Sequence, residues 1–243
     1  MANQNGYHNR KEYISSNIRN LLKSLAEAPS RYDEIVTKIE YWIEYVLRED
    51  FLTVDELVEE VSYVAWDANS GSFGSVGKFL KEFRDAPHRS EQARTFVTQM
   101  CSHVLRWFAI ASVEGVWEAY WPTTPLVSSG GGPGFIRAAS FVGYLIEWGL
   151  LGRELVQRHL TKSLTNHMHS NDTLANSPGA IRASAIYQLF TAAGNTLLQG
   201  LLKPDDVQAC FNMLDVWSRR GMVCNATKLE VRYTVCDDVS PQA

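Results

Sequence analysis

The groups best suited to nucleophilic or metal chemistry in this sequence are a cysteine and a few histidines, and their spacing argues against a site. Cys101 and His103 share a predicted helix, but side chains two residues apart on a helix point to different faces. They are therefore not placed to act together as nucleophile and base. His167 and His169 form a close pair whose polar neighbours are typical of a helix end that passes into a loop; a metal site is the alternative.

Other catalytic patterns are missing from the sequence. It holds no nucleophile elbow, no HExxH zinc motif, no cysteine and histidine set at metal spacing and no dinucleotide fingerprint. The glycine-rich run within residues 121–134 is not followed by Gly-Lys-Ser/Thr, so it predicts a long flexible loop rather than a phosphate-binding one. Glu59 and Glu60 lie on an acidic helix and are expected to be solvated. We therefore expect a protein that is not an enzyme and needs no cofactor or metal ion.

Length and composition favour a soluble globular protein. The 243 residues, 45% of them hydrophobic, suffice for a continuous core in one large domain or two small ones. No apolar stretch reaches the roughly 20 residues needed to cross a bilayer. The first ten residues lack the pattern of a signal peptide, and the four cysteines are scattered singly, as in a reducing compartment. We expect a protein of the cytoplasm, or of both cytoplasm and nucleus, with no membrane partner.

The charges are unevenly distributed along the chain. Residues 30–60 carry ten acidic and three basic side chains, whereas residues 78–110 carry six basic and three acidic ones. A solvated helix face explains such runs, and a surface that orients a partner is the alternative. The residues that would form this partner surface are Glu44, Asp55, Glu59, Lys78, Lys81 and Arg84.

Apolar residues recur at three- and four-residue spacing along most of the chain, which predicts an all-α fold. Thr53 and Glu56 have the spacing of a capping box, so a helix is expected from Val54 to about Asp67. The long apolar segment after Ser90 should form a central helix. The helices predicted from these patterns, and from the prolines and glycines between them, span about residues 12–28, 32–47, 54–67, 79–86, 91–120, 135–148, 154–168, 178–193 and 204–220.

We expect these helices to pack as consecutive antiparallel pairs in one right-handed stack, including the pair joined at residues 149–152. Residues 10–221 would form this helical domain. Residues 222–243 alternate apolar and polar side chains at the two-residue period of a strand, which predicts an extended or partly ordered tail. The side chains expected to be buried in the second half of the stack are Phe141, Leu145, Leu189, Phe190 and Phe211.

Two segments carry a resemblance to a known family. Residues 141–151, FVGYLIEWGLL, resemble the "FIGELFKLxxL" helix of MIF4G domains, which are HEAT-repeat α-solenoids. Residues 186–197, IYQLFTAAGNTL, are similar to the "LCxLLTTIGxxL" element of the same family, and the order and separation of the two segments agree with it. The chain departs from the family where Asn195 and Thr196 replace a lysine and an aspartate.

The resemblance implies a HEAT-like scaffold that holds a DEAD-box RNA helicase, with RNA and other translation or mRNA-processing factors as further partners. The matched segments are packing signatures, so they carry no contact residue over to this chain. Two alternatives remain: direct binding of single-stranded RNA, or a HEAT-like protein scaffold unrelated to RNA. RNA binding would use the basic segment together with base stacking on nearby aromatic residues. These aromatic residues are Trp107, Trp117, Tyr120, Trp121 and Trp148.

Overall fold

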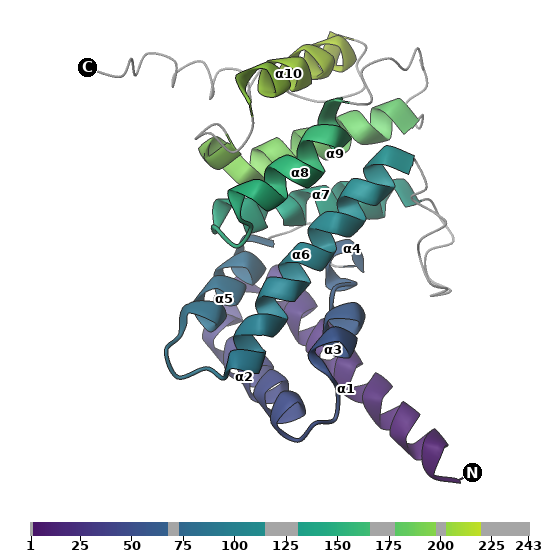
Figure 1. Ribbon diagram of the computed structural model, residues 1–243, viewed down its shortest axis with the longest axis vertical. Coiled ribbons are helices and arrows are strands. Elements are labelled where there is room, and N and C mark those ends of the chain that lie inside the picture. Colours follow the sequence, from purple (N-terminus) through teal and green to yellow (C-terminus); the bar gives the residue numbers. More distant parts are fainter. Residues whose placement is uncertain (1, 68–72, 115–130, 166–177, 198–202, 220–243) are drawn as a thin grey trace.

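The computed structural model describes residues 2–67, 73–114, 131–165, 178–197 and 203–219, and every element in these ranges is a helix (Figure 1). The expected all-α class is therefore confirmed for the described residues. The helices are α1 (Ala2–Glu27), α2 (Tyr32–Arg48), α3 (Val54–Val61), α4 (Val64–Asp67), α5 (Phe73–Asp85), α6 (Glu91–Glu114), α7 (Gly131–Glu147), α8 (Arg153–Thr165), α9 (Pro178–Ala193) and α10 (Pro204–Arg219), with the 3₁₀ helices η1 (Pro29–Arg31) and η2 (Gly194–Leu197).

The helix predicted for residues 54–67 starts as expected but is interrupted. The capping box is present, because Thr53 Oγ1 accepts from the Glu56 amide at 3.2 Å and the Glu56 carboxylate accepts from the Thr53 amide at 2.9 Å. The amide and the hydroxyl of Ser62 both bond to the carbonyl of Val58, at 3.0 and 2.6 Å. The Ala65 amide then bonds to the Ser62 carbonyl at 3.1 Å, a tighter three-residue turn that separates α3 from the short α4.

Helix α6 lies at the centre of the molecule, as its apolar sequence predicts. It packs against α2, α3, α5, α7 and α8, and Figure 1 shows it running between the N-terminal helices in the lower part and α7–α10 in the upper part. Phe108 of α6 stacks on Phe135 of α7 with ring centroids 4.9 Å apart. Phe141 of α7 in turn contacts Phe73 of α5 at 5.0 Å, so one hydrophobic core joins both parts.

Helix α7 begins earlier than the sequence predicted. Residues 131–134, which were expected to belong to the flexible loop, form its first turn. A helix tolerates Pro133 there, because the amides of the first turn have no helical acceptor and proline has no amide hydrogen to lose. Residues 121–130 of the predicted loop, the histidine pair near residue 168 and the predicted tail lie outside the described residues.

The α7–α8 connection is a close turn, but its two helices have other main partners. Gly149 adopts a positive φ of 64°, and the amides of Gly149 and Leu150 reach back to the carbonyls of Ile146 and Leu145 at 3.0 and 2.9 Å. This is a Schellman motif, for which glycine is the favoured residue. Helix α7 packs mainly along α9, and α8 packs against α6 and α10, so the predicted antiparallel pairing of α7 with α8 is wrong.

The close packing of α7 on α9 depends on Gly143. A Cβ atom at this position would lie 2.6 Å from the Cβ of Ala192 and 2.6 Å from the carbonyl oxygen of Leu189. Around this contact Phe141, Leu145, Leu189 and Phe190 are fully buried, as predicted.

Phe211 is less buried than predicted. Its side chain is only partly buried and meets the Phe190 ring edge to face, with ring centroids 5.5 Å apart. It packs on the outside of the core rather than within it. In the described residues, none of the helices combines the length and the apolar character that a membrane span needs.

Replacing Gly143 with alanine is expected to destabilise the protein by about 2 kcal/mol. Overpacking costs up to about 3 kcal/mol, and the better helix propensity of alanine offsets about 1 kcal/mol of it. Gly152→Ala is the matched control, because nothing lies within 4 Å of its added Cβ. Chemical denaturation of both variants tests the packing, and an equal loss of stability in the two would contradict the close approach of α7 and α9.

Candidate partner-binding surface

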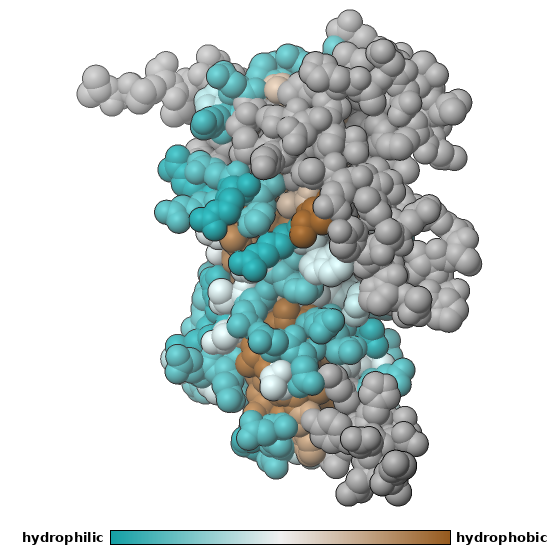
Figure 2. Space-filling model, turned by 45° about the vertical axis from the view of Figure 1, so that its right-hand side comes forward, coloured by the Kyte–Doolittle hydropathy of each residue, from teal (hydrophilic) through white to brown (hydrophobic). Residues whose placement is uncertain are grey.

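Hydrophilic residues cover most of the described surface on the face shown in Figure 2, and apolar residues appear there mainly as a narrow band between them. Large exposed hydrophobic side chains are therefore exceptions worth explaining. Among the described residues they are Tyr13, Tyr41 and Ile110, with exposed fractions of 63%, 61% and 42%. Tyr41 differs from Tyr13 in belonging to a cluster of aromatic rings.

Helix α2 presents Tyr41 to solvent because this residue lies outside its apolar stripe. Ile39 and Ile43 face the core, while Tyr41 points away and stacks on Tyr45 with centroids 5.8 Å apart and planes 9° from parallel. Trp42 meets both rings edge to face, at 5.9 and 6.1 Å. These contacts hold the rings in place, so their exposed surface is available without a large loss of side-chain entropy on binding.

Arg89, from the connection between α5 and α6, anchors the adjacent side of α2. Its side chain is only 10% exposed and forms an ion pair with Glu40, while a second carboxylate, that of Glu44, lies 3.9 Å away. The guanidinium also lies over the ring of Phe83, 4.6 Å from its centroid. A charge buried this deeply is stable only because carboxylates compensate it, so the pair fixes where the connection lies on α2.

The residues after Arg89 extend this anchor into α6. Ser90 donates its hydroxyl to the second carboxylate oxygen of Glu44 at 3.2 Å and accepts from the Ala93 amide at 3.2 Å, which makes it the cap of α6. Arg94 donates to the carbonyls of Ala86 and Pro87 at 3.2 and 3.1 Å. The connection is therefore held at both ends by side chains.

An open pocket lies where the aromatic cluster meets Arg89. Arg89 lines it, and the Nε of this side chain is buried and has no hydrogen-bond partner among the described residues. The polar and aromatic side chains that line it are Thr37, Glu40, Tyr41, Glu44, Tyr45, Arg48 and Arg89.

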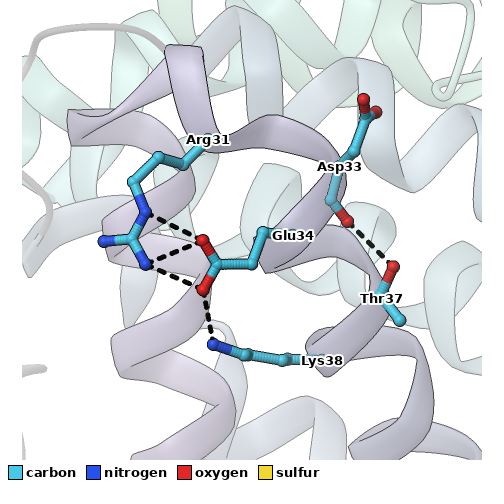
Figure 3. A network of polar contacts seen from close by, with 5 residues as sticks. All are labelled: Arg31, Asp33, Glu34, Thr37 and Lys38. Atoms are coloured by element: carbon cyan, nitrogen blue, oxygen red, sulfur yellow. Dashed lines mark hydrogen bonds and ion pairs between the residues drawn. The ribbon is translucent and has the colours of Figure 1, made fainter.

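The charges at the start of α2 are balanced within the helix. Figure 3 shows the carboxylate of Glu34 between Arg31, at 2.8 Å, and Lys38, at 2.7 Å. The hydrogen bond from Lys38 and then that from Arg31 lower the pKa of Glu34. Thr37 donates to the carbonyl of Asp33 at 2.8 Å in the same view. The acidic excess of this region therefore lies further along, at the end of α2 and in α3.

The acidic residues predicted for a partner surface are not equivalent. Asp55 and Glu59 are exposed on α3 and form no ion pair within the described ranges. Glu44 instead holds Ser90 and lies beside Arg89, so the solvated helix face expected for the acidic run does not describe this residue. The reason is the fold, which brings the connection before α6 onto α2.

The predicted basic residues lie on α5 and are largely paired there. Lys78 is 3.7 Å from Glu82, Lys81 is 2.6 Å from Asp85, and Arg84 is 2.8 Å from the same carboxylate. The hydrogen bonds from Arg84 and Lys81 lower the pKa of Asp85 to about 2. These lysines and the arginine are therefore a neutralised helix face rather than an open basic surface.

The acidic and basic segments also lie side by side. Tyr32 of α2 donates to Glu82 of α5 at 2.6 Å, and the ammonium of Lys78 lies 4.5 Å from the centre of the Tyr32 ring. Burial, followed by this hydrogen bond, raises the pKa of Tyr32. The acidic and basic runs of the sequence therefore do not form separate regions of the surface at this contact.

The groups first considered for chemistry form no reactive pair. Cys101 is fully buried, and burial raises the pKa of its thiol to about 12, so it is not a thiolate near neutral pH. His103 is half-buried on the same helix and contacts the ring of Trp107 at 5.8 Å. Nowhere in the described residues do three histidine, cysteine, aspartate or glutamate side chains come together as a metal would need.

Sequence reasoning missed the two residues that organise this surface. A tyrosine outside the apolar stripe of α2 was a usable signal for Tyr41, because a large ring facing solvent lacks a packing explanation. Arg89 gave no such signal, since its partners lie more than forty residues away in the sequence. Comparison with protein-family models, with curated proteins and with solved structures finds no match to this chain.

Replacing Arg89 with methionine is expected to lower stability by about 1–3 kcal/mol, because Glu40 loses its charged partner in a half-buried position. Arg48→Met is the control. Arg48 lines the same pocket, but its side chain is 70% exposed, so its pair with Glu49 is worth little. Thermal unfolding of both variants checks this, and a loss no greater for Arg89→Met than for Arg48→Met would show that the buried pair is not an anchor.

Proposed function

We propose that this protein is a non-enzymatic adaptor that binds a basic segment of a partner protein on the aromatic surface of α2. The observation that carries the proposal is the exposed ring of Tyr41, stacked on the partly buried Tyr45 and held beside a pocket that the buried Arg89 anchors. Tyrosine and arginine are the side chains most enriched at the centres of protein interfaces. A rigid arrangement of this kind binds with little reorganisation.

The charge around the pocket selects the partner. Residues 30–60 carry seven more acidic than basic side chains, and Arg89 offsets one of these. A lysine or arginine of the partner would gain from the face of the exposed Tyr41 ring and, at longer range, from the exposed carboxylates of Asp55 and Glu59 on α3. An acidic segment would be repelled from the same surface.

A DEAD-box RNA helicase is the partner we propose, within a HEAT-like, MIF4G-like scaffold that acts in mRNA translation or processing in the cytoplasm. Two features of the chain support this more specific proposal. The two sequence segments resembling MIF4G domains occur in family order, and they form the closely packed helices α7 and α9. The ion pairs that neutralise α5 speak against its lysines as an RNA-binding surface.

Affinity purification followed by mass spectrometry tests this proposal with a matched pair of variants. Tyr41→Ala should weaken partner binding at least tenfold and so remove the helicase from the purified material. Tyr13→Ala should leave it in place, because Tyr13 is equally exposed but belongs to none of the ring pairs that involve α2. Recovery of the same partners with both variants, or of no helicase with the parent chain, would refute the proposal.

The exposed acids of α3 test the electrostatic part of the proposal. Reversing Asp55 and Glu59 to lysine should slow association with the purified partner severalfold at low salt and leave unfolding unchanged, because exposed charges act mainly on encounter rates. Glu44 is left intact because it holds Ser90. Association rates measured at low and high salt decide the matter: an unchanged rate at low salt would mean that these acids are only solvated.

A further inference from the structure

The exposed face of α6 carries a stripe that the α2 surface does not explain. His103, Arg106, Trp107 and Ile110 follow one another at three- and four-residue spacing, so they share one side of the helix. Arg106 is exposed, Ile110 is 42% exposed, and His103 and Trp107 are half-buried. None of these four side chains belongs to the fully buried face of α6.

Helix α8, which packs against α6, repeats this pattern. Leu155, Arg158 and His159 have the same spacing; Arg158 is exposed, and the other two are half-buried. Burial first, and then the charges of Arg106 and Arg158, lower the pKa of His159. The two guanidinium groups, one from each helix, therefore both lie close enough to this ring to act on it.

Neither arginine is compensated by the described part of the chain. Other cations of the described residues form ion pairs, such as Lys81 and Arg84 with Asp85, yet Arg106 and Arg158 take part in none of those found there. The two arginines are exposed on helices that pack against each other, and neither is matched by a described carboxylate although a chain with a net charge of −4 has many. This arrangement is what a site for an anion requires.

We propose that this α6–α8 surface binds a phosphorylated serine or threonine of a partner protein, with Arg106 and Arg158 holding the phosphate. Guanidinium groups match phosphate oxygens with paired hydrogen bonds, and two arginines suit a single phosphate group. Ile110, Trp107 and Leu155 beside them offer apolar contacts to the residues that flank the phosphate. A peptide supplies both features at once.

A nucleic acid fits this surface less well. Single-stranded RNA requires a basic groove that follows several successive phosphates. The described cations of this surface are only Arg106 on α6 and Arg158 on α8. The acidic Glu59 of α3 also acts on His103 at the border of the surface and would repel an extended polyanion. A single phosphate can avoid this border.

The test uses the full chain and two immobilised degenerate 11-residue peptide mixtures. Their central residue is either an equimolar mixture of phosphoserine and phosphothreonine or the corresponding mixture of serine and threonine, and a 12-residue oligo-uridine RNA forms a third arm. Retention at least tenfold greater on the phosphorylated mixture is expected. Arg106→Gln and Arg158→Gln should each reduce it at least fivefold, and addition of the phosphorylated mixture should shift the imidazole NMR signals of His159.

Arg153→Gln is the matched control, since Arg153 is an exposed arginine five residues before Arg158 and lies on another side of α8. It should leave retention unchanged, as should Tyr41→Ala, so the result is independent of the α2 surface. The proposal would be overturned by equal retention on both mixtures, by no retention on either, or by an equal loss with Arg153→Gln. Tighter binding of the RNA with the same dependence on Arg106 and Arg158 would also overturn it.

Discussion

The packing of α6 is the constraint on which the rest of this molecule depends. It packs against α2, α3, α5, α7 and α8, and its Phe108 ring stacks on Phe135 of α7. A helix surrounded in this way cannot move without opening several interfaces, because protein interiors are closely packed. Both proposed surfaces include a helix that packs against α6. Ser90, the cap of α6, bonds to Glu44 of α2, and α8 packs against α6 beside its exposed stripe.

Most of the helices could be predicted from the sequence because their signals are local. The capping box at Thr53, the cap at Ser90 and the prolines that open α9 and α10 act within a few residues, and each lies where the structure begins a helix. The errors were also local in origin. A three-residue turn at Ser62 divides a helix that the apolar pattern predicted to be continuous, and the glycines before Pro133 form a helical turn.

The partners of each helix could not be predicted in the same way, since they depend on contacts distant in the sequence. Gly143 allows α7 to pack closely on α9, although α8 lies between them in the sequence and consecutive helices were expected to pair. The ion pair of Arg89 with Glu40 likewise joins segments that the charge pattern placed in separate acidic and basic regions. The candidate surface follows from this second contact, which is why the predicted surface contained Glu44 but missed Arg89 and Tyr41.

The central claim is that a rigid helical scaffold offers the aromatic face of α2 to a basic segment. Its most direct test is a titration of the isotope-labelled chain with a 15-residue arginine-rich peptide, followed by amide NMR. The account predicts shifts concentrated in residues 37–48 and 86–90, with none in α10, and no such shifts with a glutamate-rich peptide of equal length. Shifts that are absent, spread over the whole chain, or equal for the two peptides would contradict it.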